Sequence, residues 1–291
     1  MSKRSDIAAD EGRLLVQGPD RPGIVATVSA VLRDVGANIV ALDQHSTDPE
    51  GGRFYQRTVF HLPHLSSMAA QLESRCAERI GADLGMEWQL VESHRPKRVA
   101  LLASKGDHCL LDLLWRQRRG ELPMTVPMVI SNHADLAEDV RQFAVPYFHI
   151  PVTADTKGDA EARQLELLRG NVDLVVLARY MQILSPAFLR QVGVPVINIH
   201  HSFLPAFIGA APYERAKERG VKLVGATAHY VTEDLDMGPI IEQDVVRVAH
   251  DDSVSELRRL GADVERQVLS RAVLWHCEDR IMRHGSTTVV F

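Results

Sequence analysis

Three polar side chains in the C-terminal half of the chain could act together on a carbonyl group. Asn198 and His200 end the apolar run V-P-V-I-N-I-H, and Asp236 stands between two apolar residues in a later polar loop. An amide can donate a hydrogen bond to a developing oxyanion, an imidazole can move a proton near neutral pH, and a carboxylate can orient the imidazole or take a proton from water. On these residues alone, a capping role for Asn198 and a core role for His200 stay equally open.

The strand that carries this pair must aim both side chains at one place. Because side chains alternate along a strand, Asn198 and His200 share one face. Short apolar runs of the same kind recur from about residue 98, and segments with helical spacing, such as 110–120 and 160–170, separate most of them. This alternation predicts an α/β fold with a doubly wound, mostly parallel sheet, which binds ligands at the carboxyl ends of its strands.

The N-terminal half has a different pattern and predicts a separate domain. Residues 13–91 fit the order β-α-β-β-α-β of a ferredoxin-like domain. The polar, proline-containing segment 93–98 follows as a linker. The predicted division is therefore 10–92, 93–98 and 99–291, and the last domain ends in a long helix and an edge strand.

The composition excludes several classes of protein. The 291 residues are 45% hydrophobic and 24% charged, with a formal net charge of -5, so we expect no nucleic-acid partner. No apolar run reaches the length of a bilayer span, and the N-terminus has no apolar leader. Cys76, Cys109 and Cys277 are widely spaced, which favours a reducing compartment. We expect a cytoplasmic protein with no membrane partner.

Three histidines raise the question of a metal site. His200, His201 and His229 do not form a pair at ligand spacing on one element. The adjacent His200 and His201 also point apart if the strand continues. We therefore expect no metal.

Several long motifs resemble the folate-dependent formyltransferase fold. They are N-I-H-H-S-F-L-P-A-F (198–207), G-A-T-A-H-Y-V-x-x-x-L-D-x-G-P (225–239), 103–114 and 177–186. The N-terminal half resembles an ACT domain. An ACT domain joined to this fold is the arrangement of the formyltetrahydrofolate deformylases, and the resemblance runs from about residue 13 to 291. One departure is Ala211, where a polar or basic residue is expected.

The resemblance implies hydrolysis of 10-formyltetrahydrofolate to formate and tetrahydrofolate, with the folate as substrate and no cofactor. It assigns Asn198 and protonated His200 to the oxyanion, and Asp236 to orienting His200 and activating water. It places the pterin ring between residues 181–184 and the loop 231–236, although a packed core turn is the competing interpretation of 181–184. The substrate-binding residues predicted in this way are Met181, Gln182, Ile183, Leu184, Val231, Thr232, Glu233, Asp234, His229, Ser104, Lys105 and His108.

Water and an amine are the competing acceptors of the formyl group. The glycinamide ribonucleotide formyltransferases, which are related, hold a phosphate in a small Gly/Ser-rich loop. The corresponding loop here, Ser104–Cys109, has one glycine, and its Asp107 would repel a phosphate. This favours water, although Lys105 leaves transfer to an amine as the alternative. A catalytically inactive amino-acid sensor is a second alternative, and the intact polar triplet argues against it.

The ACT-like half predicts regulation or assembly. Such domains pair their sheets and bind small amino acids near an Asp-x-x-Gly turn, here Asp20 to Gly23. Gly23 would leave room for close approach of an effector. An amino-acid effector and a purely dimerising role stay equally open, and in both cases we expect a homo-oligomer.

Overall fold

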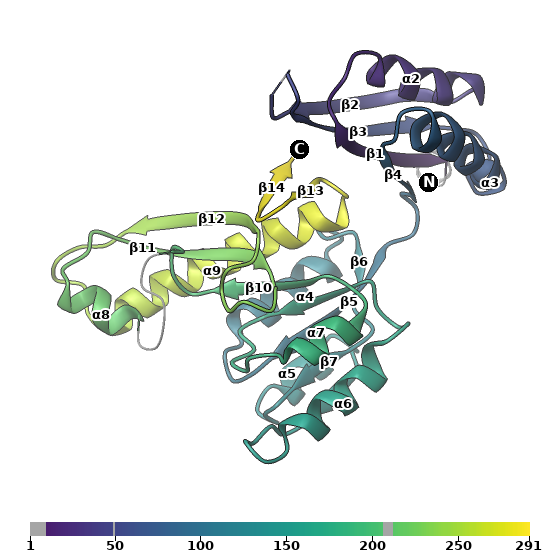
Figure 1. Cartoon of the computed structure of the whole chain (residues 1–291). Coiled ribbons are helices and arrows are strands. Elements are labelled where there is room, and N and C mark those ends of the chain that lie inside the picture. Colours follow the sequence, from purple (N-terminus) through teal and green to yellow (C-terminus); the bar gives the residue numbers. More distant parts are fainter. Residues whose placement is uncertain (1–9, 49, 206–211) are drawn as a thin grey trace. The chain divides into compact units, whose positions relative to one another are not determined.

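The chain forms two compact units in the computed structural model, which describes residues 10–48, 50–205 and 212–291 (Figure 1). The first unit comprises the chain up to Pro96 with Glu278–Met282 and Val289–Phe291, and the second comprises Lys97–Cys277 with Arg283–Thr288. Ala211, the departure noted in the sequence, lies outside the described residues. In the described part of the chain, no helix combines the length and apolar character needed to cross a membrane.

The first unit has the predicted ferredoxin-like order. Its elements are β1 (Glu11–Pro19), α2 (Ile24–Asp34), β2 (Asn38–Ser46), β3 (Arg53–His61), α3 (Leu65–Cys76), the π-helix η1 (Ala77–Ala82) and β4 (Glu87–Glu92). The antiparallel sheet has the order β2-β3-β1-β4. α2 buries Ile24, Val28, Val31 and Leu32, which stand at helical spacing in the sequence. The single helix expected after β3 is α3 followed by a π-helical turn.

The end of the chain is divided between the two units. Met282 packs in a cluster with Leu15 and Tyr55 of the first unit. Arg13 Nη1 donates to Asp279 Oδ2 at 2.9 Å. The sequence predicted a single domain over 99–291. It did not predict that Glu278–Met282 and Val289–Phe291 belong to the first unit, because contacts between residues far apart in sequence place them there.

The second unit is built on an eight-stranded sheet. Its elements are β5 (Lys97–Ala103), α4 (His108–Arg118), β6 (Met124–Thr125), β7 (Val129–Ser131), α5 (Ala137–Arg141), β8 (Tyr147–His149), α6 (Lys157–Leu168), β9 (Leu174–Leu177), α7 (Pro186–Val192), β10 (Val196–His200), α8 (Pro212–Glu218), β11 (Leu223–Tyr230), β12 (Ile240–Arg247) and α9 (Val254–Cys277); β13 (Ile281–His284) and β14 (Thr287–Val290) follow as a separate pair. The main path is β12-β11-β10-β9-β5-β7-β8, with β6 beside β5. β8, β7, β5, β9 and β10 are parallel, and β11 and β12 are antiparallel. The mostly parallel sheet is thus confirmed.

Both faces of this sheet are covered. Ala100 and Leu102 of β5 join the core cluster that α6 and α7 complete. Their neighbours Val99 and Leu101 point the other way and are equally buried. α4 and α9 contact each other, and α9 also contacts β10, β11 and β12. The carboxyl ends of β5, β9 and β10 therefore meet at one edge of a covered sheet, which is the place where a ligand site is expected.

Candidate active site

The sheet brings the three predicted catalytic side chains together. Asn198 and His200 occupy the carboxyl end of β10, between β9 and β11, and Asp236 lies in the turn that joins β11 to β12. His200 Nδ1 is 3.3 Å from Asp236 Oδ2. The other oxygen of Asp236, Oδ1, is 3.8 Å from Nε2 of His229, a residue of β11. Two strands and one turn thus place an amide, two imidazoles and a carboxylate around one point.

A tight turn holds Asp236 in place. Its φ of 56° is in the left-handed region, which is uncommon for a residue with a side chain and is frequent at functional sites. Two residues later, a Cβ on Gly238 would lie 1.7 Å from the carbonyl oxygen of Tyr230. The Tyr230 N–H donates to the carbonyl of Pro239 at 2.9 Å. Glycine at 238 therefore permits the close backbone approach that aims Asp236 inward.

The electrostatics favour a charged carboxylate facing His200. The hydrogen bond from His200 lowers the pKa of Asp236, burial opposes this shift, and the positive charge of His200 adds to it. His200 Nε2 is buried and makes no hydrogen bond within the described residues. Because Nδ1 faces Asp236, this second nitrogen is the one available to a ligand in the pocket.

His229 fixes the orientation of the Asn198 amide. Its Nδ1 is 3.0 Å from the Tyr230 carbonyl, which can only accept, so the proton is on Nδ1 and Nε2 carries a lone pair. Asn198 Nδ2 donates to that Nε2 at 3.3 Å. Burial lowers the pKa of His229, which is 2% exposed, and keeps the ring neutral. The second N–H of the Asn198 amide is left for the pocket.

A pocket of about 790 Å³ surrounds these groups. On one side, Met181 and Ile183 are 57% and 61% exposed, so they form an open apolar surface and not the packed core turn considered from sequence. The residues predicted to bind substrate that line the pocket are Met181, Gln182, Ile183, Leu184, Val231, Thr232, Glu233, His229 and His108.

Three predicted substrate-binding residues are placed differently. Ser104 is buried below the pocket, where its hydroxyl donates to Asn132 Oδ1 at 2.7 Å and accepts from the Met181 N–H at 2.9 Å. It supports the segment 181–184 from behind. Lys105 and Asp234 are exposed and are not among the residues that line the pocket.

The far side of the pocket holds a polar network that the sequence did not reveal. Glu265 of α9 accepts hydrogen bonds from His108 Nε2 at 2.8 Å and from the Tyr213 hydroxyl at 2.9 Å. Arg179 Nε is 3.5 Å from the same carboxylate. Glu265 lies outside the motifs found in the sequence, because His108 and Glu265 meet only when α4 and α9 pack together.

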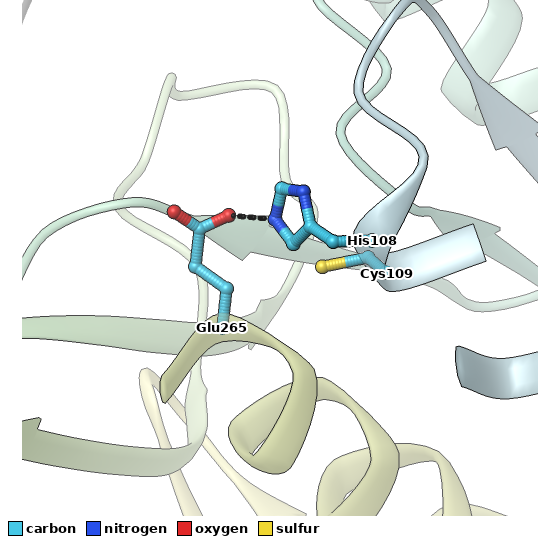
Figure 2. Close-up of side chains that lie close together, drawn as sticks. All are labelled: His108, Cys109 and Glu265. Atoms are coloured by element: carbon cyan, nitrogen blue, oxygen red, sulfur yellow. Dashed lines mark hydrogen bonds and ion pairs between the residues drawn. The ribbon is translucent and has the colours of Figure 1, made fainter. Parts of the chain in front are cut away.

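Three groups of this network could be considered as metal ligands. Ligand atoms of His108, Cys109 and Glu265 lie within 4.8 Å of one another (Figure 2). Burial raises the pKa of the Cys109 thiol well above its usual range, so the sulfur keeps its proton and is a weak ligand. Arg179 already supplies a positive charge beside Glu265. The donor set therefore fits a metal poorly.

The residues expected at an effector site of the first unit lie at the end of β1. Asp20 accepts a hydrogen bond from the Ser46 hydroxyl, and its N–H donates to the carbonyl of Gly52 at 2.9 Å. Gly23 precedes α2 with a φ of 94°, and a Cβ at this position would meet open space. The turn is thus held by its aspartate and open at its glycine.

Comparison with known proteins agrees with both units. The Formyl transferase family matches residues 97–273, and the ACT domain matches residues 12–77. A formyltetrahydrofolate deformylase from Mycobacterium tuberculosis (strain ATCC 25618 / H37Rv) is 65% identical over 283 residues, which are 97% of this chain and 91% of that protein.

Solved structures show the same likeness. A formyltetrahydrofolate deformylase from Pseudomonas syringae pv. tomato str. DC3000 has a TM-score of 0.89 and 46% identity, over 97% of this chain and 94% of that one. Glycinamide ribonucleotide transformylase 1 from Symbiobacterium toebii has a TM-score of 0.64 and 34% identity, over 68% of this chain and 95% of that one. Fold and site thus define a formyl transferase domain joined to an ACT domain. The chain belongs to the formyltetrahydrofolate deformylases, a family of hydrolases.

Proposed function

We propose that the chain hydrolyses 10-formyltetrahydrofolate to formate and tetrahydrofolate. The observation that carries this proposal is the convergence of Asn198, His200 and Asp236 in one pocket. Relatives that match nearly the whole length of the chain are named for this reaction. A formyl group on nitrogen is an amide, and amide hydrolysis needs two donors for the oxyanion and a group that takes a proton from water.

The attack of water forms the oxyanion. The water oxygen bonds to the formyl carbon while one proton passes to Asp236, and the carbonyl electrons move to oxygen. The free N–H of Asn198 and the Nε2–H of the His200 imidazolium donate to that oxygen. Asp236, facing His200 Nδ1, stabilises the charged ring.

Collapse of the intermediate completes the reaction. The bond from the formyl carbon to N10 breaks, N10 keeps the electron pair, and His200 or a water molecule supplies its proton. Formic acid then loses a proton to solvent and leaves as formate, and the proton held by Asp236 passes back to the group that protonated N10. The apolar surface of Met181 and Ile183 receives the flat pterin ring, with residues 231–236 on its other side.

The test uses the full chain with 10-formyltetrahydrofolate and no acceptor. Tetrahydrofolate and formate should appear in equal amounts, and Asn198→Ala should lower kcat by about 10²- to 10³-fold. Asn171→Ala, at an exposed position, is the matched control. Product formed only with glycinamide ribonucleotide would instead identify a transferase. Absence of turnover with amino-acid binding retained would identify a sensor. Either result would reject the hydrolysis.

The N-terminal domain is proposed to assemble the enzyme and to bind a small amino acid near Asp20 and Gly23. β2 is an edge strand with Val40 61% exposed and Leu42 37% exposed, which suits pairing with a second copy. Light scattering after gel filtration measures the subunit number, which Val40→Glu should lower. Calorimetric titration with individual amino acids tests the effector.

A further inference from the structure

The segment 181–184, which carries the apolar surface of the pocket, is held at its C-terminal end by a residue of α6. Ser185 directly follows this segment and is the N-cap of α7, where its hydroxyl accepts from the Phe188 N–H at 3.0 Å. Glu161 of α6 accepts the Ser185 N–H at 2.9 Å and, with its other oxygen, the Ser185 hydroxyl. One carboxylate thus binds both polar groups at the point where the segment ends.

The start of the segment is held from the same helix. Gln164 lies three residues after Glu161, so the two side chains share one face of α6. Its Nε2 donates to the hydroxyl of Tyr180, the residue that directly precedes the segment, at 2.9 Å. Both side chains are buried, so water does not compete for this bond. α6 therefore holds the residues on both sides of 181–184.

The segment needs such support because it exposes its apolar side chains. Met181 and Ile183 are exposed, whereas Leu184 is buried and packs in the core with Tyr180. Side chains that stay exposed bury little apolar surface, so packing does little to fix their position. The place of this surface is therefore set by the residues that flank it, which are Tyr180, Leu184 and Ser185.

We propose that Glu161 and Gln164 are positioning residues for the folate, and that they fix the apolar surface that receives the pterin ring. The proposal rests on the function proposed above and extends it to groups that do not touch the substrate. Neither residue is among those that line the catalytic pocket in the described part of the chain. The surface binds the ring alike before and during the reaction, so its displacement weakens substrate binding and leaves the chemical step unchanged.

The test compares three substitutions of Glu161 in the full chain. Glu161→Ala removes both bonds to Ser185 and should raise KM for 10-formyltetrahydrofolate by about tenfold, with kcat within about twofold of the wild type. Glu161→Gln keeps the length of the side chain and can bond both Ser185 groups, so KM should return to within about threefold of the wild type. Glu161→Asp keeps the charge but is one methylene shorter, so its KM should resemble that of Glu161→Ala.

Further variants and a binding measurement complete the test. Gln164→Met, which loses the donor to Tyr180, should also raise KM, by about three- to tenfold. Glu166→Ala, at an exposed position of the same helix, is the matched control. Calorimetric titration with tetrahydrofolate measures Kd without turnover, and Kd should change as KM does.

Thermal unfolding separates positioning from stability. A merely structural role would lower the melting temperature and the amount of active enzyme, which lowers kcat and leaves KM and Kd unchanged. If Glu161→Ala does not fold, the comparison of Glu161→Asp with Glu161→Gln decides the question.

Each result separates this proposal from the hydrolase function. A folded Glu161→Ala with the KM and Kd of Glu166→Ala would overturn the role of Glu161 and leave the hydrolysis intact. A fall confined to kcat, or tighter binding by Glu161→Asp than by Glu161→Gln, would do the same. Absence of hydrolysis by a wild type that binds tetrahydrofolate would overturn the function, and Kd would still decide the role of Glu161. A wild type that neither hydrolyses 10-formyltetrahydrofolate nor binds tetrahydrofolate would overturn both.

Discussion

His229 offers a sharp test of the catalytic geometry, because it accepts a hydrogen bond from the amide of Asn198. The substitution His229→Phe keeps a ring of similar size at a position that is 2% exposed. It removes the Nε2 lone pair that accepts from the Asn198 amide at 3.3 Å. It also removes the contact of Nδ1 with the Tyr230 carbonyl. The amide is then free to rotate and to turn its oxygen toward the oxyanion.

The expected magnitude follows from what the amide loses. A buried hydrogen bond contributes about 0.5–1.5 kcal/mol net. This corresponds to a change of about 2- to 12-fold in the ratio of the two amide orientations. A complete flip of the amide replaces a donor by an acceptor. The loss in kcat then approaches the about 10²- to 10³-fold expected on removing an oxyanion donor. We therefore expect His229→Phe to lower kcat by about 10- to 100-fold with little change in KM, and Asn198→Ala to lower it further.

The assay is steady-state release of tetrahydrofolate, combined with thermal unfolding. In the double variant of Asn198→Ala with His229→Phe, the second change should cost almost nothing, because the amide that it positions is gone. His229→Gln, which keeps an acceptor, should recover part of kcat, and His149→Phe at an exposed position is the control. Full kcat in a folded His229→Phe, or strictly additive effects in the double variant, would refute the positioning role.

Three further outcomes test the same site. Asp236→Asn should lower kcat by at least about 10²-fold, since it loses the partner of His200 and the proton acceptor. Gly238→Ala should lower the free energy of unfolding by about 1–3 kcal/mol and kcat by about 10²-fold, because its Cβ would overlap the Tyr230 carbonyl; calorimetry and kinetics measure both. Burial lowers the pKa of His201 from 6.5 to about 4, so the unfolded chain binds more protons in this window and stability is lost as the pH falls through it. His201→Gln should reduce the fall in the free energy of unfolding between about pH 7 and about pH 4 by up to about 3 kcal/mol. Denaturant unfolding at both pH values measures this difference.

Much of the fold and part of the site followed from local pattern. Alternation along V-I-N-I-H put Asn198 and His200 on one face of β10, and a parallel sheet puts that strand end in the ligand crevice. The helical spacing of Ile24, Val28 and Val31 likewise gave α2. In these cases the deciding interaction is periodic in the sequence, so it can be read without coordinates.

Other parts of the site depend on contacts that no local pattern contains. Glu265 is an ordinary polar residue in a helix until His108 and Tyr213 reach it from distant segments. Ser104 was expected to face the substrate, but its hydroxyl faces Asn132 and the backbone of Met181. A side chain in a loop after a strand can turn toward the ligand or toward the core, and only the neighbouring strand ends decide between them.

The bond between Ser104 and the Met181 backbone has a consequence for how a flat ring would enter. One hydroxyl joins the ends of three neighbouring strands, β5, β7 and β9, through Ser104, Asn132 and Met181. The backbone of residues 181–184, which we propose to face the ring, is therefore anchored to the sheet. On this side a ligand would meet a wall that is already held in place, and little ordering entropy would have to be given up there on binding.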